Sequence, residues 1–149
     1  MKILAFASAG GHWVQLLRLV PSFGIDKNEV VFATTNKSYY QSVLGYGFFH
    51  VTDANRKSRF KFCKMFFETA TLVVKLRPDL IITTGAAPGL IAIICAKLIG
   101  RKAIWIDSIA NVDKLSLSGK IASFFADRTY TQWPHLATSK IMYKGSILS

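Results

Sequence analysis

The sequence predicts an α/β protein with a Rossmann-like parallel sheet and helices on both faces of that sheet. Short runs rich in β-branched and aromatic residues alternate along the chain with runs of helical character, which is typical of such a fold. Small and polar residues follow several of the short runs, where the carboxyl ends of strands would lie. The length of 149 residues suits a single domain over 1–149 that buries a core without disulfides or metals.

The first third of the chain contains three expected strands and two helical segments. Lys2–Ala7 is apolar but short and leads into paired glycines, which favours a first strand over a signal peptide. His12–Val20 is expected to be a helix, because a proline closes it. Glu29–Ala33 and Phe48–Val51 are expected strands, and a helical stretch near Ser38–Leu44 separates them.

The middle of the chain continues the alternation. Arg59–Leu76 predicts a long helix that ends before a proline, and Leu80–Thr83 predicts the fourth strand. Pro88–Ile99 predicts a helix with proline at its start and glycine after its end. The turn of small residues between this strand and helix interrupts a run that would otherwise resemble a membrane span. Ala103–Asp107 is the fifth expected strand.

The last third of the chain predicts one more helix and one or two strands. Ser118 is expected to cap a helix over Gly119–Ala126, and Arg128–Gln132 is the sixth strand. The remaining residues form a mixed tail that can add a short strand within Ile141–Ile147. We expect no transmembrane helix in any part of this sequence.

The chain is both basic and apolar. It has 19 Lys and Arg against 8 Asp and Glu, a formal net charge of +11, and 51% hydrophobic residues with a mean hydropathy of +0.31. This hydrophobic content excludes a disordered chain and argues against a histone-like or ribosomal-tail protein. A basic, apolar fold is expected to work against an anionic surface, which leaves membrane lipid and nucleic acid as candidates.

The cysteines and histidines give no sign of a metal site. Cys63 and Cys95 lie far apart in apolar surroundings, so we expect two reduced, buried thiols. The three histidines, at positions 12, 50 and 135, lack the spacing of metal ligands. We therefore expect neither a metal nor an organic cofactor.

The junction Ser8–His12, between the first strand and the first helix, is the first candidate binding site. Gly10 and Gly11 allow a ligand to approach the backbone, and a helix N-terminus favours an anion such as phosphate. His12 is placed to act as a base or to donate a hydrogen bond to a diphosphate. The same residues also suit a tight turn, and spacing alone favours neither interpretation. A GxGxxG motif is missing from the chain, which argues against NAD.

Two further loops follow expected strands. Thr83–Gly89 contains Gly85 and leads into a helix, which suits ligand contact or close packing of the strand against the helix equally well. The loop after the fifth strand places Asn111 and Asp113 near the same edge, although capping and turn roles would also explain them.

The segment from Arg56 to Arg77 predicts a membrane-contacting helix. Five polar residues fall on a stripe about 80° wide when about 100° is allowed per residue: Lys61, Lys64, Glu68, Thr71 and Lys75. Apolar residues occupy most of the rest of the cylinder. A helix on a sheet needs one apolar face, so a second face must be buried elsewhere. A bilayer surface fits the aromatic and basic N-terminal end, and a helix crossed by neighbours is the alternative. Nucleic acid fits less well, because the chain carries no recognised nucleic-acid-binding motif. The residues predicted to contact the membrane are Arg56, Lys57, Arg59, Phe60, Lys61, Phe62, Lys64, Phe66 and Phe67.

Several blocks together resemble one family. They are Gly10-Gly11-His12 with Leu16–Leu19, the loop Thr84–Gly89, the block Leu115–Lys120, and Ala126-Asp127-Arg128 followed by Gln132-Trp133-Pro134. They resemble the membrane-anchoring subunit of the two-subunit UDP-N-acetylglucosamine transferase of dolichol-linked oligosaccharide synthesis, and still more its bacterial capsule and exopolysaccharide relatives. The resemblance extends over almost the whole chain.

The resemblance implies the N-terminal, acceptor-side half of a GT-B glycosyltransferase, similar to the enzyme that makes lipid II. In this family the donor nucleotide-sugar binds mainly on a second Rossmann-like domain that is a separate chain. The eukaryotic members carry an N-terminal membrane helix. This sequence is expected to lack one, so the resemblance shifts membrane attachment to Arg56–Leu76.

The resemblance also implies an activity. The chain is expected to be one subunit of a hexosyltransferase, peripheral on the cytoplasmic face of the inner membrane, acting in capsule or exopolysaccharide synthesis. It would hold a polyprenyl-diphosphate-linked sugar and share a cleft with a partner chain that carries a UDP-sugar. His12 is the candidate base, and Gly10, Gly11, Gly85, Asn111 and Asp113 would line the acceptor or its phosphates. A non-catalytic scaffold for a partner transferase and a stand-alone nucleotide-binding module are the alternatives.

Overall fold

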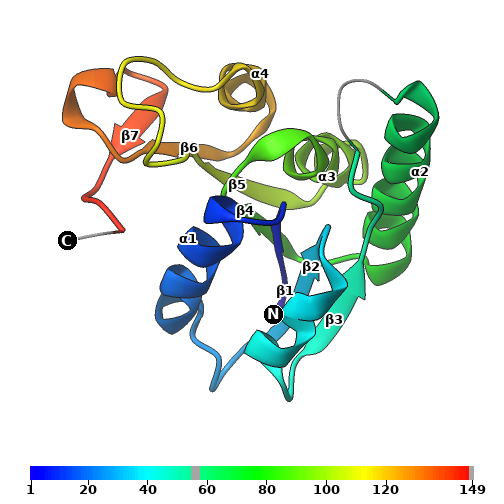
Figure 1. Cartoon of the computed structure of the whole chain (residues 1–149). Coiled ribbons are helices and arrows are strands. Elements are labelled where there is room, and N and C mark those ends of the chain that lie inside the picture. The colour runs from blue at the N-terminus through cyan, green and yellow to red at the C-terminus, as the bar shows by residue number, and fades with distance from the viewer. Residues whose placement is uncertain (55–57, 148–149) are drawn as a thin grey trace.

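All seven strands of the sheet run parallel in the computed structural model, which describes residues 1–54 and 58–147 (Figure 1). Their order across the sheet is β3-β2-β1-β4-β5-β6-β7. The order reverses between β1 and β4, which are neighbours although the chain visits β2 and β3 between them. The strands are β1 (Lys2–Ala7), β2 (Glu29–Thr34), β3 (Gly47–His50), β4 (Leu80–Thr83), β5 (Lys102–Ile106), β6 (Arg128–Thr131) and β7 (Ile141–Tyr143).

Helices cover both faces of this sheet, as the alternation in the sequence predicted. Helix α1 (Gly11–Leu19) and the 3-10 helices η1 (Val20–Phe23) and η2 (Lys37–Val43) pack on one face. The other face is covered by helices that follow β3 in the chain. These are α2 (Arg59–Leu76), α3 (Ala86–Leu98) and α4 (Leu117–Phe125), and the 3-10 helix η3 (Pro134–Leu136) follows β6.

The central strand β1 is buried on both faces because each face carries a helical layer. Leu4 and Phe6 point into the core under α2 and α3, whereas Ile3 and Ala5 point into the core under α1. Parallel strands covered on both sides read as continuous apolar runs, which is why this strand was predictable from composition alone. The α/β, Rossmann-like prediction is confirmed.

Some predicted element boundaries were wrong, and side-chain hydrogen bonds mark the start of two of these helical segments. Ser116, not Ser118, caps α4, because its Oγ accepts from the Gly119 amide at 2.8 Å. Helix α3 begins at Ala86, two residues before its predicted start at Pro88. The expected helical stretch after β2 is a 3-10 helix, and Asn36 caps it by accepting from the Ser38 amide. The additional strand expected in the tail is β7, shorter than its predicted range.

Candidate functional site

The edge of the sheet at the carboxyl ends of β1 and β4 carries two glycine loops. The chain leaves β1 towards one face of the sheet and leaves β4 towards the other, which is the arrangement at which ligands bind in open α/β sheets. Gly10 (φ 83°) precedes α1 and Gly85 (φ 135°) precedes α3, both with backbone conformations that favour glycine. No side chain in the described part of the molecule caps either helix, so two electropositive helix N-termini meet at this edge.

His12 connects the two glycine loops. Its Nδ1 lies 2.8 Å from the carbonyl oxygen of Thr84, and the Thr84 hydroxyl donates to the carbonyl oxygen of His12 at 2.7 Å. A Cβ on Gly85 would lie 2.6 Å from the imidazole Cε1, so glycine is required for the ring to fit. Because a carbonyl oxygen can only accept, Nδ1 carries the proton, and Nε2 of the neutral ring is left as a proton acceptor.

The loop before α1 is held from the neighbouring strand. Thr35, directly after β2, accepts a hydrogen bond from the Ala9 amide through its Oγ1 at 3.0 Å. The Tyr39 hydroxyl accepts from the Gly10 amide at 3.1 Å. These contacts fix the glycine turn, while the first two amides of α1, those of Gly11 and His12, precede the first intrahelical hydrogen bond, which the Trp13 amide donates to the Gly10 carbonyl oxygen. The structure therefore brings Gly10, Gly11, His12 and Gly85 together at one edge of the sheet.

Asn111 and Asp113 lie at the same edge of the sheet, in the loop that follows β5. Asn111 lies in the loop after β5, where its Nδ2 donates to Oδ2 of the buried Asp107 at 2.9 Å. That bond commits its amide nitrogen to the loop itself. Asp113 is exposed on the same loop. The structure supports a structural role for Asn111 and places neither side chain in contact with His12.

Asp107 organises this loop. Its Oδ1 accepts from Trp105 Nε1 at 3.0 Å and from the Ser116 hydroxyl at 2.7 Å. Its Oδ2 accepts from the Ser116 amide at 3.1 Å, in addition to Asn111. Gly119 leaves room for this carboxylate, because a Cβ at that position would overlap Oδ1. The Ser-x-x-Gly spacing in the block Leu115–Lys120 thus serves both the capping of α4 and the packing of Asp107.

Two glutamines that sequence reasoning missed join this loop to α1. The buried Gln15 accepts from the Ile109 amide at 3.0 Å and donates to the Ser108 hydroxyl at 3.0 Å. Gln132 donates to Gln15 Oε1 at 3.2 Å and to the Asp107 carbonyl oxygen at 3.3 Å. The Gln-Trp-Pro block marks Gln132 in the sequence, but its hydrogen-bond partners Gln15 and Asp107 are distant in sequence, so the contacts could not be predicted from it.

Helix α2 places the predicted membrane-contacting residues on the surface. It buries only one face, through Met65, Thr69, Leu72 and Val73, so the alternative of a helix crossed by neighbours on several sides is wrong. Phe60 is 81% exposed and Phe67 is 67% exposed. Arg59, Lys61, Phe62, Lys64 and Phe66 are exposed too, whereas Arg56 and Lys57 lie outside the described residues. Cys63 is also exposed, which corrects the expectation of a buried thiol, while Cys95 is buried.

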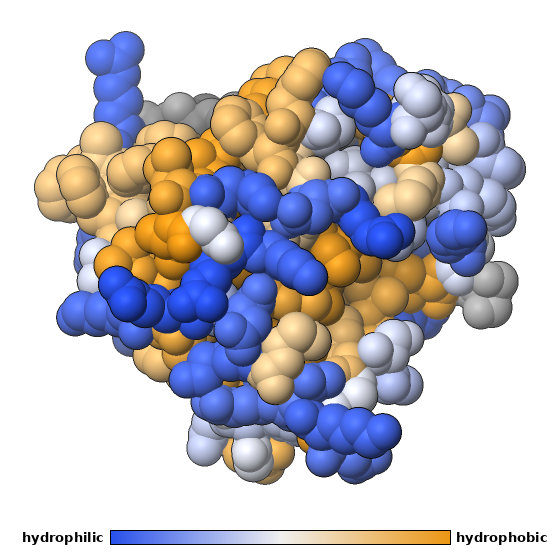
Figure 2. Space-filling model, turned by 180° about the vertical axis from the view of Figure 1, so that it is seen from behind, coloured by the Kyte–Doolittle hydropathy of each residue, from blue (hydrophilic) through white to orange (hydrophobic). Residues whose placement is uncertain are grey.

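The outward side of α2 forms an apolar stripe. Phe60, Cys63, Phe67 and Val74 follow one another at spacings of three, four and seven residues, which places them on one side of a helix. Helix α4 adds the exposed Phe124 on the same face of the sheet. Figure 2 shows hydrophobic residues over α2 on the left and over α4 at the upper centre, bordered by hydrophilic side chains.

Two features are missing from residues 1–54 and 58–147. No group of three or more His, Cys, Asp or Glu side chains there is arranged to hold a metal ion. No helix in these ranges has the length and apolar character needed to span a bilayer.

The fold and the glycine-lined edge define the class: the chain has the architecture of one half of a GT-B glycosyltransferase. It superposes on MurG from Acinetobacter baumannii with a TM-score of 0.75 at 15% identity, covering 97% of this chain and 46% of that one. A UDP-N-acetylglucosamine 2-epimerase from Rickettsia bellii gives a TM-score of 0.75 at 13% identity, covering 99% and 45%. The chain thus spans a little under half the length of these proteins.

Within that class, the chain belongs to the Alg14-like family of oligosaccharide biosynthesis proteins, whose model matches residues 49–147. The UDP-N-acetylglucosamine transferase subunit ALG14 of Mus musculus is 29% identical over 184 aligned positions, covering 99% of this chain and 83% of that protein. The corresponding subunit of Schizosaccharomyces pombe is 46% identical over 68 positions, covering 41% and 31%.

Proposed function

We propose that this chain is the acceptor-side subunit of a two-chain UDP-sugar glycosyltransferase. The observation that carries the proposal is the position of His12. It joins the two glycine loops at the carboxyl ends of β1 and β4, and its Nε2 stays available as a proton acceptor. The acceptor hydroxyl attacks the anomeric carbon of the UDP-sugar, the bond to the UDP oxygen breaks, and Nε2 takes the hydroxyl proton. The N-termini of α1 and α3 bind the acceptor diphosphate through Gly10, Gly11 and Gly85.

The names of the curated relatives support the subunit role, since each is a subunit of a UDP-N-acetylglucosamine transferase. The donor half is a separate chain in this proposal, because the curated relatives are named as subunits of a transferase. The acceptor is a polyprenyl-diphosphate-linked sugar, and the pathway is capsule or exopolysaccharide synthesis at the cytoplasmic face of the inner membrane. The acceptor class, the pathway and the location rest on the sequence resemblance.

Donor binding is expected to require the partner. Titration of the isolated chain with UDP-N-acetylglucosamine, followed by calorimetry, should give little or no heat of binding. The same titration of the chain mixed with its donor-side partner should give saturable binding. Tight binding to the isolated chain would contradict the two-chain model and favour a stand-alone nucleotide-binding module.

Peripheral membrane attachment through α2 is the second part of the proposal. The outward Phe60 and Phe67 would enter the interface, while Arg59, Lys61 and Lys64 would contact anionic headgroups. Replacing both phenylalanines with glutamate should reduce binding to anionic vesicles by more than tenfold. Burying one such side chain contributes about 1.5–3 kcal/mol, and tenfold corresponds to about 1.4 kcal/mol.

Sedimentation with phosphatidylglycerol vesicles measures this change. Gln41→Glu together with Ser38→Glu is the matched control, because both residues are exposed on η2, on the opposite face of the sheet. Equal loss of binding in the control would show that added negative charge, rather than loss of the aromatic face, causes the effect.

A further inference from the structure

The 3-10 helix after β2 brings a tyrosine hydroxyl to the glycine-lined edge. Tyr39 lies in η2, and its hydroxyl oxygen accepts from the Gly10 amide at 3.1 Å. A phenol can accept and donate at the same time, and here its oxygen is the acceptor because an amide N–H can only donate. Among residues 1–54 and 58–147, no group accepts the phenolic proton. Tyr39 therefore has one hydrogen bond left to donate to a ligand.

The ring of Tyr39 is fixed by its contacts with α1. It stacks on the buried Trp13, with ring centroids 5.4 Å apart and an angle of 15° between the ring planes. Trp13 Nε1 donates to the Ser42 hydroxyl at 3.1 Å, and that hydroxyl donates to the Tyr39 carbonyl oxygen at 2.6 Å. Because these contacts hold the ring before a ligand binds, little side-chain entropy is lost when the phenol donates to one.

A second hydroxyl beside the same loop also has a proton to donate. Thr35 follows β2 and is only 6% exposed, and its Oγ1 accepts from the Ala9 amide at 3.0 Å. In the part of the chain that the structure describes, this hydroxyl donates to no other group. A buried donor without an acceptor is destabilising, so an acceptor atom supplied by a ligand would stabilise this loop.

The space beside these hydroxyls is open. A Cβ on Gly10 would meet no atom within 4 Å, and a Cβ on Gly11 would meet only Gln15 Nε2, at 3.9 Å. The amides of Gly11 and His12 begin α1 at this point. Hydroxyl and amide donors beside an open space at a helix N-terminus suit an anionic oxygen, and hydrogen bonds to such an oxygen are stronger than those to a neutral one.

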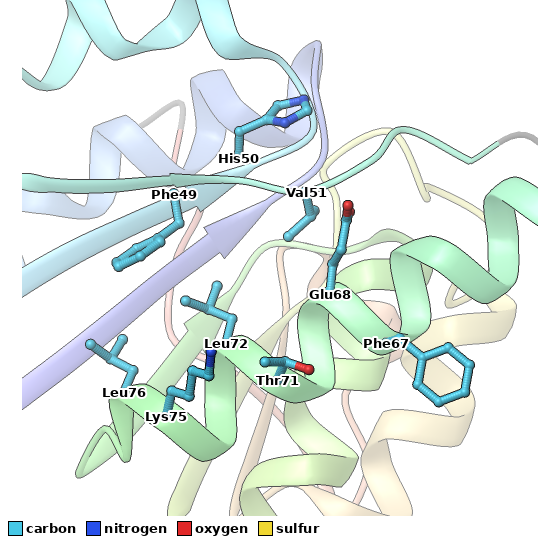
Figure 3. Close-up of a pocket in the computed structure, with 9 residues that line it drawn as sticks. All are labelled: Phe49, His50, Val51, Phe67, Glu68, Thr71, Leu72, Lys75 and Leu76. Atoms are coloured by element: carbon cyan, nitrogen blue, oxygen red, sulfur yellow. The ribbon is translucent and has the colours of Figure 1, made fainter.

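A groove of about 650 Å³ between β3 and α2 is less suited to an anion (Figure 3). Phe49 points across it towards Leu72. Partial burial acts to raise the pKa of Glu68 in this groove, but the hydrogen bond from the Thr52 amide lowers it below its ordinary value, so Glu68 is negatively charged at neutral pH. Although Lys75 also lines the groove, its apolar wall and its carboxylate disfavour a phosphoryl group.

We propose that Tyr39 is a binding residue for a phosphoryl group of the substrate, to which its phenol donates while it still accepts from the Gly10 amide. Thr35 is the second hydroxyl donor to this group. The inference rests on the proposed function, which brings the acceptor diphosphate to the N-terminus of α1. It adds to the glycine loops two side chains from the segment after β2, and it assigns the phosphoryl group to the acceptor rather than to the UDP-sugar.

Titration of the full chain with inorganic pyrophosphate tests the site without any transfer reaction. Amide NMR signals of Gly11 and His12 should shift saturably in the wild-type chain. Tyr39→Phe should weaken the affinity about tenfold or more, because a hydrogen bond to a charged group is among the stronger ones. Tyr40→Phe is the matched control on η2, since its hydroxyl makes no hydrogen bond among the described residues, and it should leave the affinity unchanged.

A fluorinated tyrosine separates donation to a ligand from a purely structural role. Fluorine next to the hydroxyl makes a phenol a stronger donor and a weaker acceptor. At a pH that keeps the phenol protonated, this residue at position 39 should bind pyrophosphate as tightly as Tyr39 or more tightly. An affinity as low as that of Tyr39→Phe would mean that the phenol only accepts from Gly10, and would overturn the proposal.

Thr35 gives an independent test that does not alter Tyr39. Thr35→Val removes the hydroxyl but keeps the shape of the side chain, and it should weaken pyrophosphate binding. Thr35→Ser keeps the hydroxyl and should restore the affinity. Absence of pyrophosphate binding in the wild-type chain, or full affinity in both Tyr39→Phe and Thr35→Val, would overturn the proposal.

Kinetics of the reconstituted pair identify the source of the phosphoryl group. Tyr39→Phe should raise the KM for the polyprenyl-diphosphate-linked acceptor about tenfold or more and leave the KM for the UDP-sugar unchanged. A rise confined to the KM for the UDP-sugar would assign the group to the donor and overturn the proposal.

Failure of this inference can be distinguished from failure of the proposed function. If the pair transfers sugar but neither KM nor pyrophosphate binding depends on Tyr39, the inference fails while the acceptor-side function stands. If pyrophosphate binding depends on Tyr39 but the pair transfers no sugar, the proposed function fails while the phosphoryl site stands.

Discussion

Replacing His12 with alanine should lower sugar transfer by the reconstituted pair of chains by at least about a hundredfold, since a positioned general base typically contributes 10²–10⁴-fold. The Nδ1 hydrogen bond to the Thr84 carbonyl fixes the tautomer, and the close contact with Gly85 fixes the ring plane. Transfer from a radiolabelled UDP-sugar to a polyprenyl-diphosphate-sugar acceptor measures the effect. Association of the two chains, followed by co-purification, should not change.

His12→Asn separates catalysis from structure. The asparagine amide can donate to the Thr84 carbonyl oxygen, but it cannot take a proton from an acceptor hydroxyl. We expect this variant to be as slow as His12→Ala and to unfold closer to the wild-type temperature. Full activity in either variant would end the catalytic assignment of His12 and would favour a scaffold that leaves all chemistry to its partner.

Much of the fold was predictable because it depends on local patterns. β1 is buried on both faces, so its apolar run stands out, and the prolines and glycines around α1 and α3 mark turns by their restricted or permissive backbones. The exposed second face of α2 follows from counting residues around a helix. Ser116 and Ser118 cannot be distinguished in this way, because the choice depends on which hydroxyl also reaches Asp107.

The candidate site was predictable only in part. Paired glycines and a histidine after a strand indicate an anion site, but His12 contacts Thr84, which is 72 positions away. Gln15 and Gln132 are 117 positions apart, and although Gln132 belongs to the Gln-Trp-Pro block, nothing in the local sequence indicates that the two side chains meet. The groove beside α2 depends on β3 being the edge strand, and strand order is set by the whole topology.

The second large effect concerns stability. Asp107→Ala should reduce the free energy of unfolding by about 3 kcal/mol or more, because it leaves the buried Trp105 Nε1–H and three further donors without their acceptor. For a chain of this size this corresponds to a fall in melting temperature of about 6–12 °C. Thermal and urea unfolding measure it, and Asp113→Ala, an exposed aspartate on the same loop, should change neither.

A double-mutant cycle assigns that loss to the carboxylate contact. Gly119→Ala should be strongly destabilising, because its methyl group would overlap Asp107 Oδ1 and would also approach the Ser116 hydroxyl to 2.9 Å. In the Asp107→Ala background the first of these overlaps is gone, so Gly119→Ala should cost less there. Additive effects would contradict direct contact between the two positions.

Gln132 donates hydrogen bonds both to the Asp107 carbonyl oxygen and to Gln15 on α1. Destabilising the loop around Asp107 should therefore also lower transfer, although none of these substitutions changes His12.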